Sequence, residues 1–188
     1  FSGFAKLTIS DMEISHYKTG LSLMDADGRV ERTPTLTNVR VRNSTSTLRT
    51  STTGIYLGAN IKGSLSGSTI DSTDVGILIA NGNRTVVENN MIVDCHTGIR
   101  AAGINPLPLR KQVFLLQYPI PNAKAFEVLD AGPWMVANNS IYGYPIGVKA
   151  VNATLNFTSN IMWNYELMLP IPIQNVGSSI ANSFNDIY

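Results

Sequence analysis

Apolar residues recur along the chain in a short alternating pattern that starts at a small residue. Gly54, Gly76 and Gly98 are equally spaced, and Ala125, which opens the same pattern, precedes Gly147 by the same interval. An apolar-x-apolar alternation predicts short strands, and a fixed interval predicts units that stack, because each unit is too short to bury its own apolar face. The pattern Gly-apolar-x-apolar occurs at residues 20–23, 54–57, 76–79, 98–101 and 147–150.

Two further positions repeat upstream of the glycine. An apolar residue lies six positions before it, and a residue that favours turns lies three positions earlier still. Asn, Asp and Gly tolerate the left-handed backbone conformation of a tight corner, so a column of them predicts a stacked turn. The apolar residues are Ile14, Ile70, Ile92 and Ile141, and the turn residues are Asp11, Gly67, Asn89 and Asn138, with Asn38 at the same distance before Val41.

Each unit therefore predicts three short strands separated by corners, as in residues 86–88, 91–93 and 98–101. Such units resemble the right-handed parallel β-helix of the pectate-lyase-like superfamily. The resemblance implies an all-β fold, a right-handed single-stranded parallel β-helix of about seven coils, with a rise of about 4.8 Å per coil. We expect one domain over residues 1–188, loop insertions near 43–53 and 103–122, and a longer parent chain that continues the coil.

The alternation also separates inward from outward residues on the third strand of each unit. The first and third positions after the glycine point inward, and the second points outward. Stacking then places the outward residues of successive coils side by side. The inward pairs include Leu21/Leu23, Ile55/Leu57, Ile77/Ile79 and Phe126/Val128, and the outward row is Ser22, Tyr56, Leu78, Arg100, Glu127, Lys149 and Met168.

The outward row contains charged residues in three consecutive coils, Arg100, Glu127 and Lys149. In the family that the chain resembles, the corresponding strand forms the floor of the substrate groove. That resemblance implies catalytic roles for the three residues on an acidic sugar, because cations neutralise a uronate, and a stacking role for Tyr56. The same plus-minus-plus row is also typical of an ordinary cross-strand charge ladder, and both interpretations stay open.

The corner before this strand holds a second candidate group. Asp74 and His96 fall at equivalent positions of adjacent coils, with Asp94 and Arg100 nearby. An Asp–His pair beside an arginine is suited to acid–base work on a glycoside or uronate, so we assign Asp74 and His96 as catalytic candidates and Asp94 as a substrate-binding one. A solvated structural pair is the alternative. The chain lacks the paired Asp-Asp and Arg-Ile-Lys of polygalacturonases and the Asp-rich calcium site of pectate lyases.

Composition narrows the classes of partner. The chain has 188 residues, 44% hydrophobic and 14% charged, and a net charge of +1 without runs of like charge, which argues against nucleic acid. No apolar stretch is long enough for a membrane span. We expect no cofactor, with Ca²⁺ as the alternative: residues 25–28 resemble a fragment of a calcium loop, but the downstream glutamate is missing. The single cysteine, Cys95, is expected to be buried, and Trp134 and Trp163 are expected to pack.

Two classes of function follow from these observations. The first is an extracellular or cell-surface carbohydrate-active domain, a lyase or a hydrolase, acting on an acidic polysaccharide. The second is a non-catalytic β-helix, such as an adhesin, a stalk, a surface-layer segment or a glycan-binding coil bundle. A phage tailspike belongs to this second class and would be trimeric, whereas a fragment would associate with the rest of its parent chain.

Overall fold

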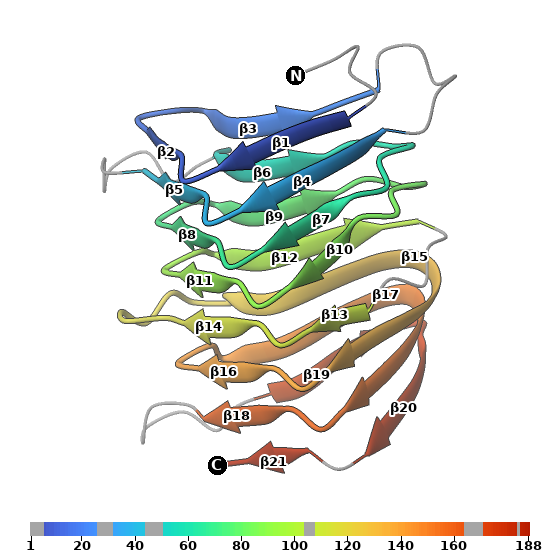
Figure 1. The fold of residues 1–188 in the computed structure, drawn as a ribbon. Coiled ribbons are helices and arrows are strands. Elements are labelled where there is room, and N and C mark those ends of the chain that lie inside the picture. Colours follow the sequence, from blue (N-terminus) through green and yellow to red (C-terminus); the bar gives the residue numbers. More distant parts are fainter. Residues whose placement is uncertain (1–5, 26–31, 44–50, 104–107, 164–170, 184) are drawn as a thin grey trace.

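The chain folds into a right-handed parallel β-solenoid of about six turns, close to the seven predicted (Figure 1). The structure is a computed structural model, and it describes residues 6–25, 32–43, 51–103, 108–163, 171–183 and 185–188. The strands stack from the N-terminus at the top of Figure 1 to the C-terminus at the bottom. All the strand pairs are parallel, and the strands form three faces of a coil.

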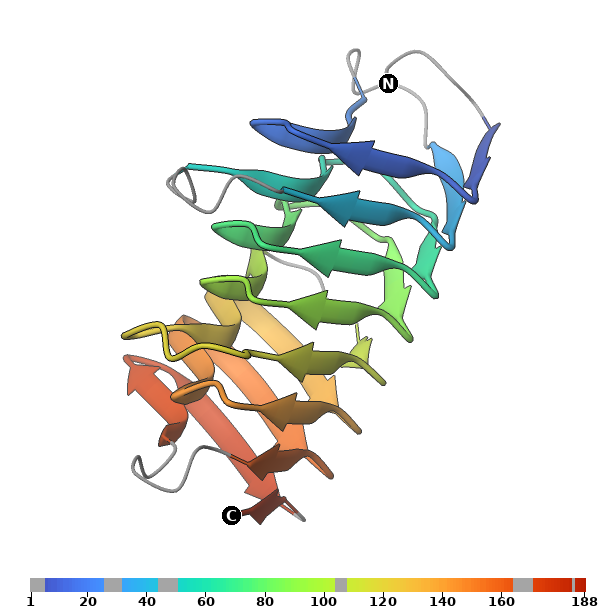
Figure 2. The same cartoon turned by 90° about the vertical axis from the view of Figure 1, so that its left-hand side faces the viewer.

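The three faces follow the order of strands within a coil. The first and third faces belong to one 13-stranded sheet, joined through the long strands β15 (Lys124–Ala137) and β17 (Ile146–Thr158), and the second face is a separate 8-stranded sheet (Figure 2). The first face consists of β1 (Lys6–Ser10), β4 (Thr33–Thr37), β7 (Ser64–Ser66), β10 (Val86–Glu88), β13 (Pro108–Arg110), the C-terminal parts of β15 and β17, and β20 (Ser179–Ser183). The second face consists of β2 (Glu13–Ser15), β5 (Arg40–Arg42), β8 (Thr69–Asp71), β11 (Met91–Val93), β14 (Val113–Leu115), β16 (Ser140–Tyr142), β18 (Ile161–Trp163) and β21 (Asp186–Ile187). The third face consists of β3 (Thr19–Leu23), β6 (Thr53–Leu57), β9 (Val75–Ile79), β12 (Thr97–Ala102), the N-terminal parts of β15 and β17, and β19 (Ile171–Val176).

The apolar core fills the inside of the coil, and the predicted inward residues lie in it. Ile55, Leu57, Ile77 and Val128 are each at most 1% exposed. Full burial of such a side chain stabilises the folded state by about 1.5–3 kcal/mol. Cys95 is also buried, as predicted, and burial raises the pKa of its thiol to about 11. The thiol therefore stays protonated at neutral pH and acts as a core residue.

The glycines that open three consecutive repeats, Gly54, Gly76 and Gly98, lie at a close approach between coils. A Cβ atom added to Gly76 would lie 2.5 Å from the carbonyl oxygen of Gly98, and one added to Gly98 would lie 2.5 Å from that of Ala125. Gly54 makes the same approach to Gly76, at 2.6 Å. A side chain at these positions would therefore collide with the backbone of the next coil.

The corner between the first and second faces contains the predicted column of turn residues. Asp11, Asn38, Gly67, Asn89 and Asn138 all have φ between 53° and 59°. The prediction of a left-handed stacked corner is confirmed at all five positions. Two further residues of the column, Lys111 and Ser159, adopt the same conformation without a favourable residue type.

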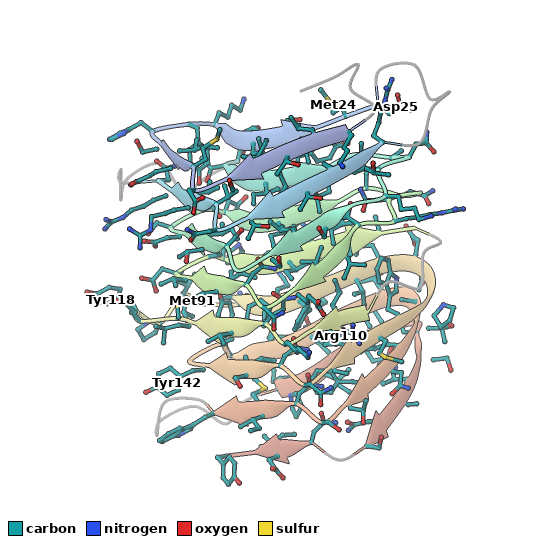
Figure 3. All side chains as sticks on the ribbon, viewed as in Figure 1. Met24, Asp25, Met91, Arg110, Tyr118 and Tyr142 are labelled. Carbon is teal, nitrogen blue, oxygen red and sulfur yellow. The ribbon has the colours of Figure 1, made fainter. Side chains whose placement is uncertain are left out.

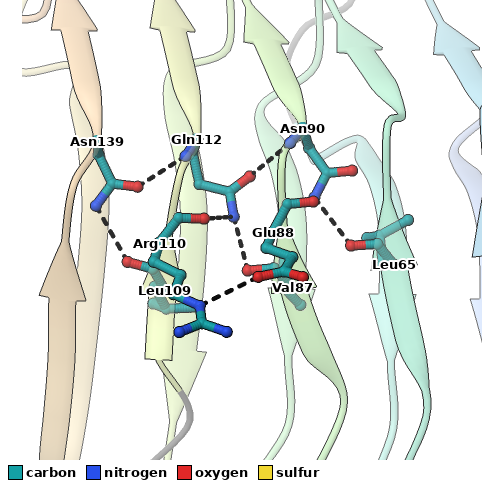
Figure 4. A network of polar contacts seen from close by, with 8 residues as sticks. All are labelled: Leu65, Val87, Glu88, Asn90, Leu109, Arg110, Gln112 and Asn139. Carbon is teal, nitrogen blue, oxygen red and sulfur yellow. Dashed lines mark hydrogen bonds and ion pairs between the residues drawn. The ribbon is translucent and has the colours of Figure 1, made fainter.

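A column of buried polar side chains follows directly after this corner and links the coils (Figure 4). Asn90 donates hydrogen bonds from Nδ2 to the carbonyl oxygens of Leu65 and Glu88, and its Oδ1 accepts one from the Ser68 amide. Gln112 repeats the arrangement one coil later, and its Oε1 accepts a hydrogen bond from the Asn90 amide. The column satisfies backbone groups at a corner where the strand ladder is interrupted. Its members are Ser68, Asn90, Gln112, Asn139 and Asn160.

Candidate functional site

The outward row of the third face lies in register, as the repeat predicts. Leu78 pairs with Arg100, Arg100 with Glu127, and Glu127 with Lys149. One expected neighbour is wrong: the residue that pairs with Lys149 is Gln174, not Met168, which lies outside the described residues. The last coil is longer than the repeat interval, so the assumption of a shortened coil gave the wrong position.

Glu127 is the centre of a cluster of three cations. Its carboxylate accepts a hydrogen bond from Nε of Arg100 and lies 3.4 Å from Nζ of Lys149 and 4.0 Å from Nζ of Lys124. The Glu127 side chain is only 7% exposed, and Arg100 and Lys149 are about one third exposed. The neighbouring coils therefore cover the carboxylate and leave part of each outer cation open to solvent.

The cations keep Glu127 ionised. Burial raises the pKa of its carboxyl group, but the hydrogen bond from Arg100 and the charges of Arg100, Lys124 and Lys149 outweigh burial. The pKa of Glu127 is therefore lowered below its ordinary value of 4.5. A carboxyl group in this state holds neighbouring cations in place and does not supply a proton near neutral pH.

Lys124 is the residue of this cluster that the sequence analysis missed. It is the first residue of β15 and pairs with Thr97 and Ile146 on either side. Burial lowers the pKa of its amine below 10.5; the charge of Glu127 opposes this shift, and the charges of Lys149 and Arg100 add to it. The signal that could have found it is a charged residue in a column otherwise occupied by Thr53, Val75, Thr97 and Ile146.

The predicted corner pair is present beside this cluster. Nδ1 of His96 lies 3.3 Å from Oδ1 of Asp74, and both side chains are about one third exposed. The charge of Asp74 also raises the pKa of Lys124, so the corner pair and the cation cluster act on each other electrostatically. Their catalytic roles stay predictions.

The two substrate-binding candidates lie in different surroundings. Asp94 is buried, adopts φ 48°, and accepts a hydrogen bond from the Gln117 amide at 2.7 Å. This contact fixes the start of the loop between β14 and β15, so the carboxylate stabilises that loop. Tyr56 is half-buried in the outward row and is separated from Arg100 by Leu78. Its stacking role stays a prediction.

The same loop contains the extra residues of the fourth repeat. Val93 pairs with Leu115 at the ordinary repeat interval, whereas the step from Arg100 to its partner Glu127 is longer, so the additional residues lie between these two points. Tyr118 lies in this loop, is 66% exposed, and projects from the edge of the solenoid (Figure 3). Trp134 is buried, and Trp163 on β18 packs edge to face against Tyr142 but stays 56% exposed.

The calcium-like segment cannot be placed, because residues 26–28 lie outside the described residues. Among the described residues, no group of three His, Cys, Asp or Glu side chains is arranged to hold a metal ion. The part of the chain that the structure describes also contains no helix long and apolar enough to cross a membrane.

One of three comparisons with known proteins finds a match, and it agrees with this architecture. Comparison with curated proteins and with solved structures gives no match. A family model described as "Right handed beta helix region" matches residues 1–107, which is more than half of the chain. The chain therefore belongs to the right-handed β-helix family.

Proposed function

We propose that the chain is an extracellular carbohydrate-active β-helix domain that binds an acidic polysaccharide on its third face and cleaves it by β-elimination. The observation that carries the proposal is the cation cluster. Three cations surround one ionised carboxylate, and two of them, Arg100 and Lys149, are partly open to solvent. Cations that are held in place and exceed the neighbouring negative charge favour binding of a sugar that carries a carboxylate.

The cluster also provides what β-elimination requires. Arg100 and Lys149 would neutralise the uronate carboxylate, which makes the proton on the adjacent carbon easier to remove. Lys124 would take that proton in its neutral form, which burial favours by lowering the pKa of the amine. The C–H electrons then form the carbon–carbon double bond, and the glycosidic C–O bond breaks with the oxygen leaving to be protonated by water.

Hydrolysis is less well supported by the same residues. A glycoside hydrolase needs a protonated carboxyl group as general acid. The lowered pKa of Glu127 keeps it ionised, and Asp74 is paired with His96. The alternative role for the corner pair is to supply the acid–base groups of a hydrolase, which would then release reducing ends without forming a double bond.

A panel of uronate polymers tests the proposal. We expect an increase in ultraviolet absorbance from the unsaturated product, lost by about 100-fold or more in Lys124→Met because the base is removed. Arg100→Ala should weaken polymer binding. Lys111→Asn removes one positive charge at a distant corner and keeps a residue that tolerates its φ of 56°, so it should retain full activity.

A non-catalytic domain is the second candidate, and one observation favours it. Arg100 and Lys149 already contact Glu127, as in a structural charge ladder. Binding of a uronate polymer without new absorbance or new reducing ends would support a glycan-binding β-helix. Absence of both binding and cleavage across the panel would refute the lyase and the glycan-binding domain and would leave a structural β-helix such as a stalk.

A further inference from the structure

The second face is divided into a charged half and an uncharged half. On β2, β5 and β8 four of the six outward residues carry charge: Glu13, Arg40, Arg42 and Asp71, with Ser15 and Thr69 between them. On the next four strands, none of the eight outward residues carries charge, and seven are apolar or aromatic. These eight residues are Met91, Val93, Val113, Leu115, Ser140, Tyr142, Ile161 and Trp163.

Most of the uncharged half, here called the apolar patch, is open to solvent, whereas Leu115 is half-buried and Val93 is buried. Trp163 is 56% exposed, Ile161 50%, Met91 44%, Val113 42% and Tyr142 37%. Tyr142 and Trp163 pack edge to face with their ring centres 5.5 Å apart. Met91 and Tyr142 project outward from the left side of Figure 3, which faces the viewer in Figure 2. Contiguous apolar surface of this extent is typical of an interaction site.

The chemistry of the patch excludes several kinds of occupant. It carries no charge, so it does not suit the acidic polysaccharide proposed for the third face. Only Ser140, Tyr142 and Trp163 offer polar side-chain atoms, whereas a neutral sugar needs many hydrogen-bond partners. Every strand of the patch is hydrogen-bonded on both sides, so no open edge is available to an added strand. The occupant therefore presents a flat apolar face.

We infer that the apolar patch is the interface of a two-fold dimer of this chain. The patch itself has the required flat, uncharged character, and a two-fold axis makes it its own partner. The outward positions of β11 and β18 are about 14 Å apart, three strand spacings. Two such faces would pack as sheets about 10 Å apart, without burying a charge.

The borders of the patch select one orientation. A two-fold axis parallel to the strands, passing between β14 and β16, brings β11 of one copy over β18 of the other and β8 over β21. Asp186, exposed on β21, then lies over a hollow of about 220 Å³ that is lined by Arg40, Arg42, Thr69 and Asp71. Asp71 already pairs with Arg42 at 3.3 Å, so Arg40 is the cation that meets Asp186 across the dimer, and this pairing favours the reversed orientation.

Sedimentation over a range of concentrations tests the inference on the chain as it stands. We expect a reversible monomer–dimer equilibrium, because the patch is at the small end of specific interfaces. Trp163→Lys and Val113→Lys should each raise the dimer dissociation constant about tenfold or more. Met135→Lys is the matched control, because Met135 is 44% exposed but lies on the first face, and it should dimerise like the wild type.

Charge reversal tests the orientation. Arg40→Glu and Asp186→Arg should each weaken the dimer, and the double variant should recover much of the lost affinity. If the double variant dimerises more weakly than either single variant, the reversed arrangement is wrong. A trimer, a wild type that stays monomeric at every concentration, or lysine variants that associate like Met135→Lys would overturn the interface.

Fluorescence keeps the test independent of variants that fail to fold. The sequence has two tryptophans, and Trp134 is 1% exposed, so acrylamide quenching reports mainly on Trp163. Quenching should decrease as the wild-type protein dimerises with rising concentration. Unchanged quenching in a sample that sediments as a dimer would place the interface elsewhere.

Discussion

The ion cluster around Glu127 predicts a large loss of stability when its charge is removed. Glu127→Gln keeps the size of the side chain but leaves Arg100, Lys124 and Lys149 close together without a counter-charge. A hydrogen bond to a charged group contributes about 1.5–3 kcal/mol, and the repulsion among the cations adds to its loss. We expect a decrease of about 3 kcal/mol in the free energy of unfolding, or about 6–12 °C in the melting temperature of a chain of this size.

Thermal melts followed by circular dichroism measure this effect, and Glu88→Gln is the control. Glu88 pairs with Arg110 at 3.1 Å on the first face, where the two side chains are 27% and 44% exposed. Such an exposed pair contributes at most about 1 kcal/mol. Equal losses in Glu127→Gln and Glu88→Gln would refute the conclusion that burial makes the Glu127 cluster special.

The contribution of Glu127 to stability should also depend on pH, in a direction that its pKa determines. The pKa of Glu127 is lower in the folded state than its ordinary 4.5, so its contribution to stability is complete above that value. The contribution is lost as the pH falls through the folded-state pKa. The difference in stability between the wild type and Glu127→Gln should therefore shrink in the acid range below pH 4.5. A difference that stays constant there would contradict the assigned ion pairing.

Three further substitutions test the coil itself by thermal melts. Ile77→Asp should prevent folding because it buries a charge in the core, whereas Leu78→Asp on the outer face should be tolerated. Equal melts would refute the assignment of faces. Gly98→Ala should cost about 2–4 kcal/mol, since its Cβ meets the next carbonyl oxygen at 2.5 Å, and wild-type stability would contradict this. Asn90→Ala should lower the free energy of unfolding by about 2–4 kcal/mol because it leaves buried backbone groups unpaired, and Asn90→Ser should have an intermediate effect. An unchanged stability of Asn90→Ala would contradict the role of the buried column.

The repeat predicts the register of the third face because two patterns give the same alignment. These are the alternation of inward and outward residues and the interval between successive repeats. Residues one repeat apart are neighbours wherever a coil has the ordinary length, which places Leu78 beside Arg100. The prediction failed where a coil changes length, as at Met168, because sequence spacing alone does not show where extra residues leave the coil. The pairing of Lys149 with Gln174 depends on a lengthened coil, which only the structure resolves.

Two side chains lie in columns outside the Gly-apolar-x-apolar motif, which therefore does not predict their surroundings. Lys124 precedes the repeat position by one residue, and its charge replaces the Thr, Val and Ile of neighbouring coils. Trp163 follows the inward residue Met162 and is therefore outward, as Tyr142 is outward after Ile141. Alternation along the second face therefore predicts the exposure of Trp163.

Lys124 is expected to lower the stability of the fold, although the proposed function requires it. Its side chain is 10% exposed, and its contact with Glu127 is long, at 4.0 Å. Because burial lowers its pKa in the folded state, the protonated amine costs stability near neutral pH, and this cost declines as the pH rises towards 10.5. Lys124→Thr restores the residue type of the previous coil, so it should leave the melting temperature unchanged or raise it. The same variant should lose cleavage of uronate polymers. Retained activity would exclude Lys124 as the base, whereas a clear loss of stability would show that the amine is a structural partner of Glu127.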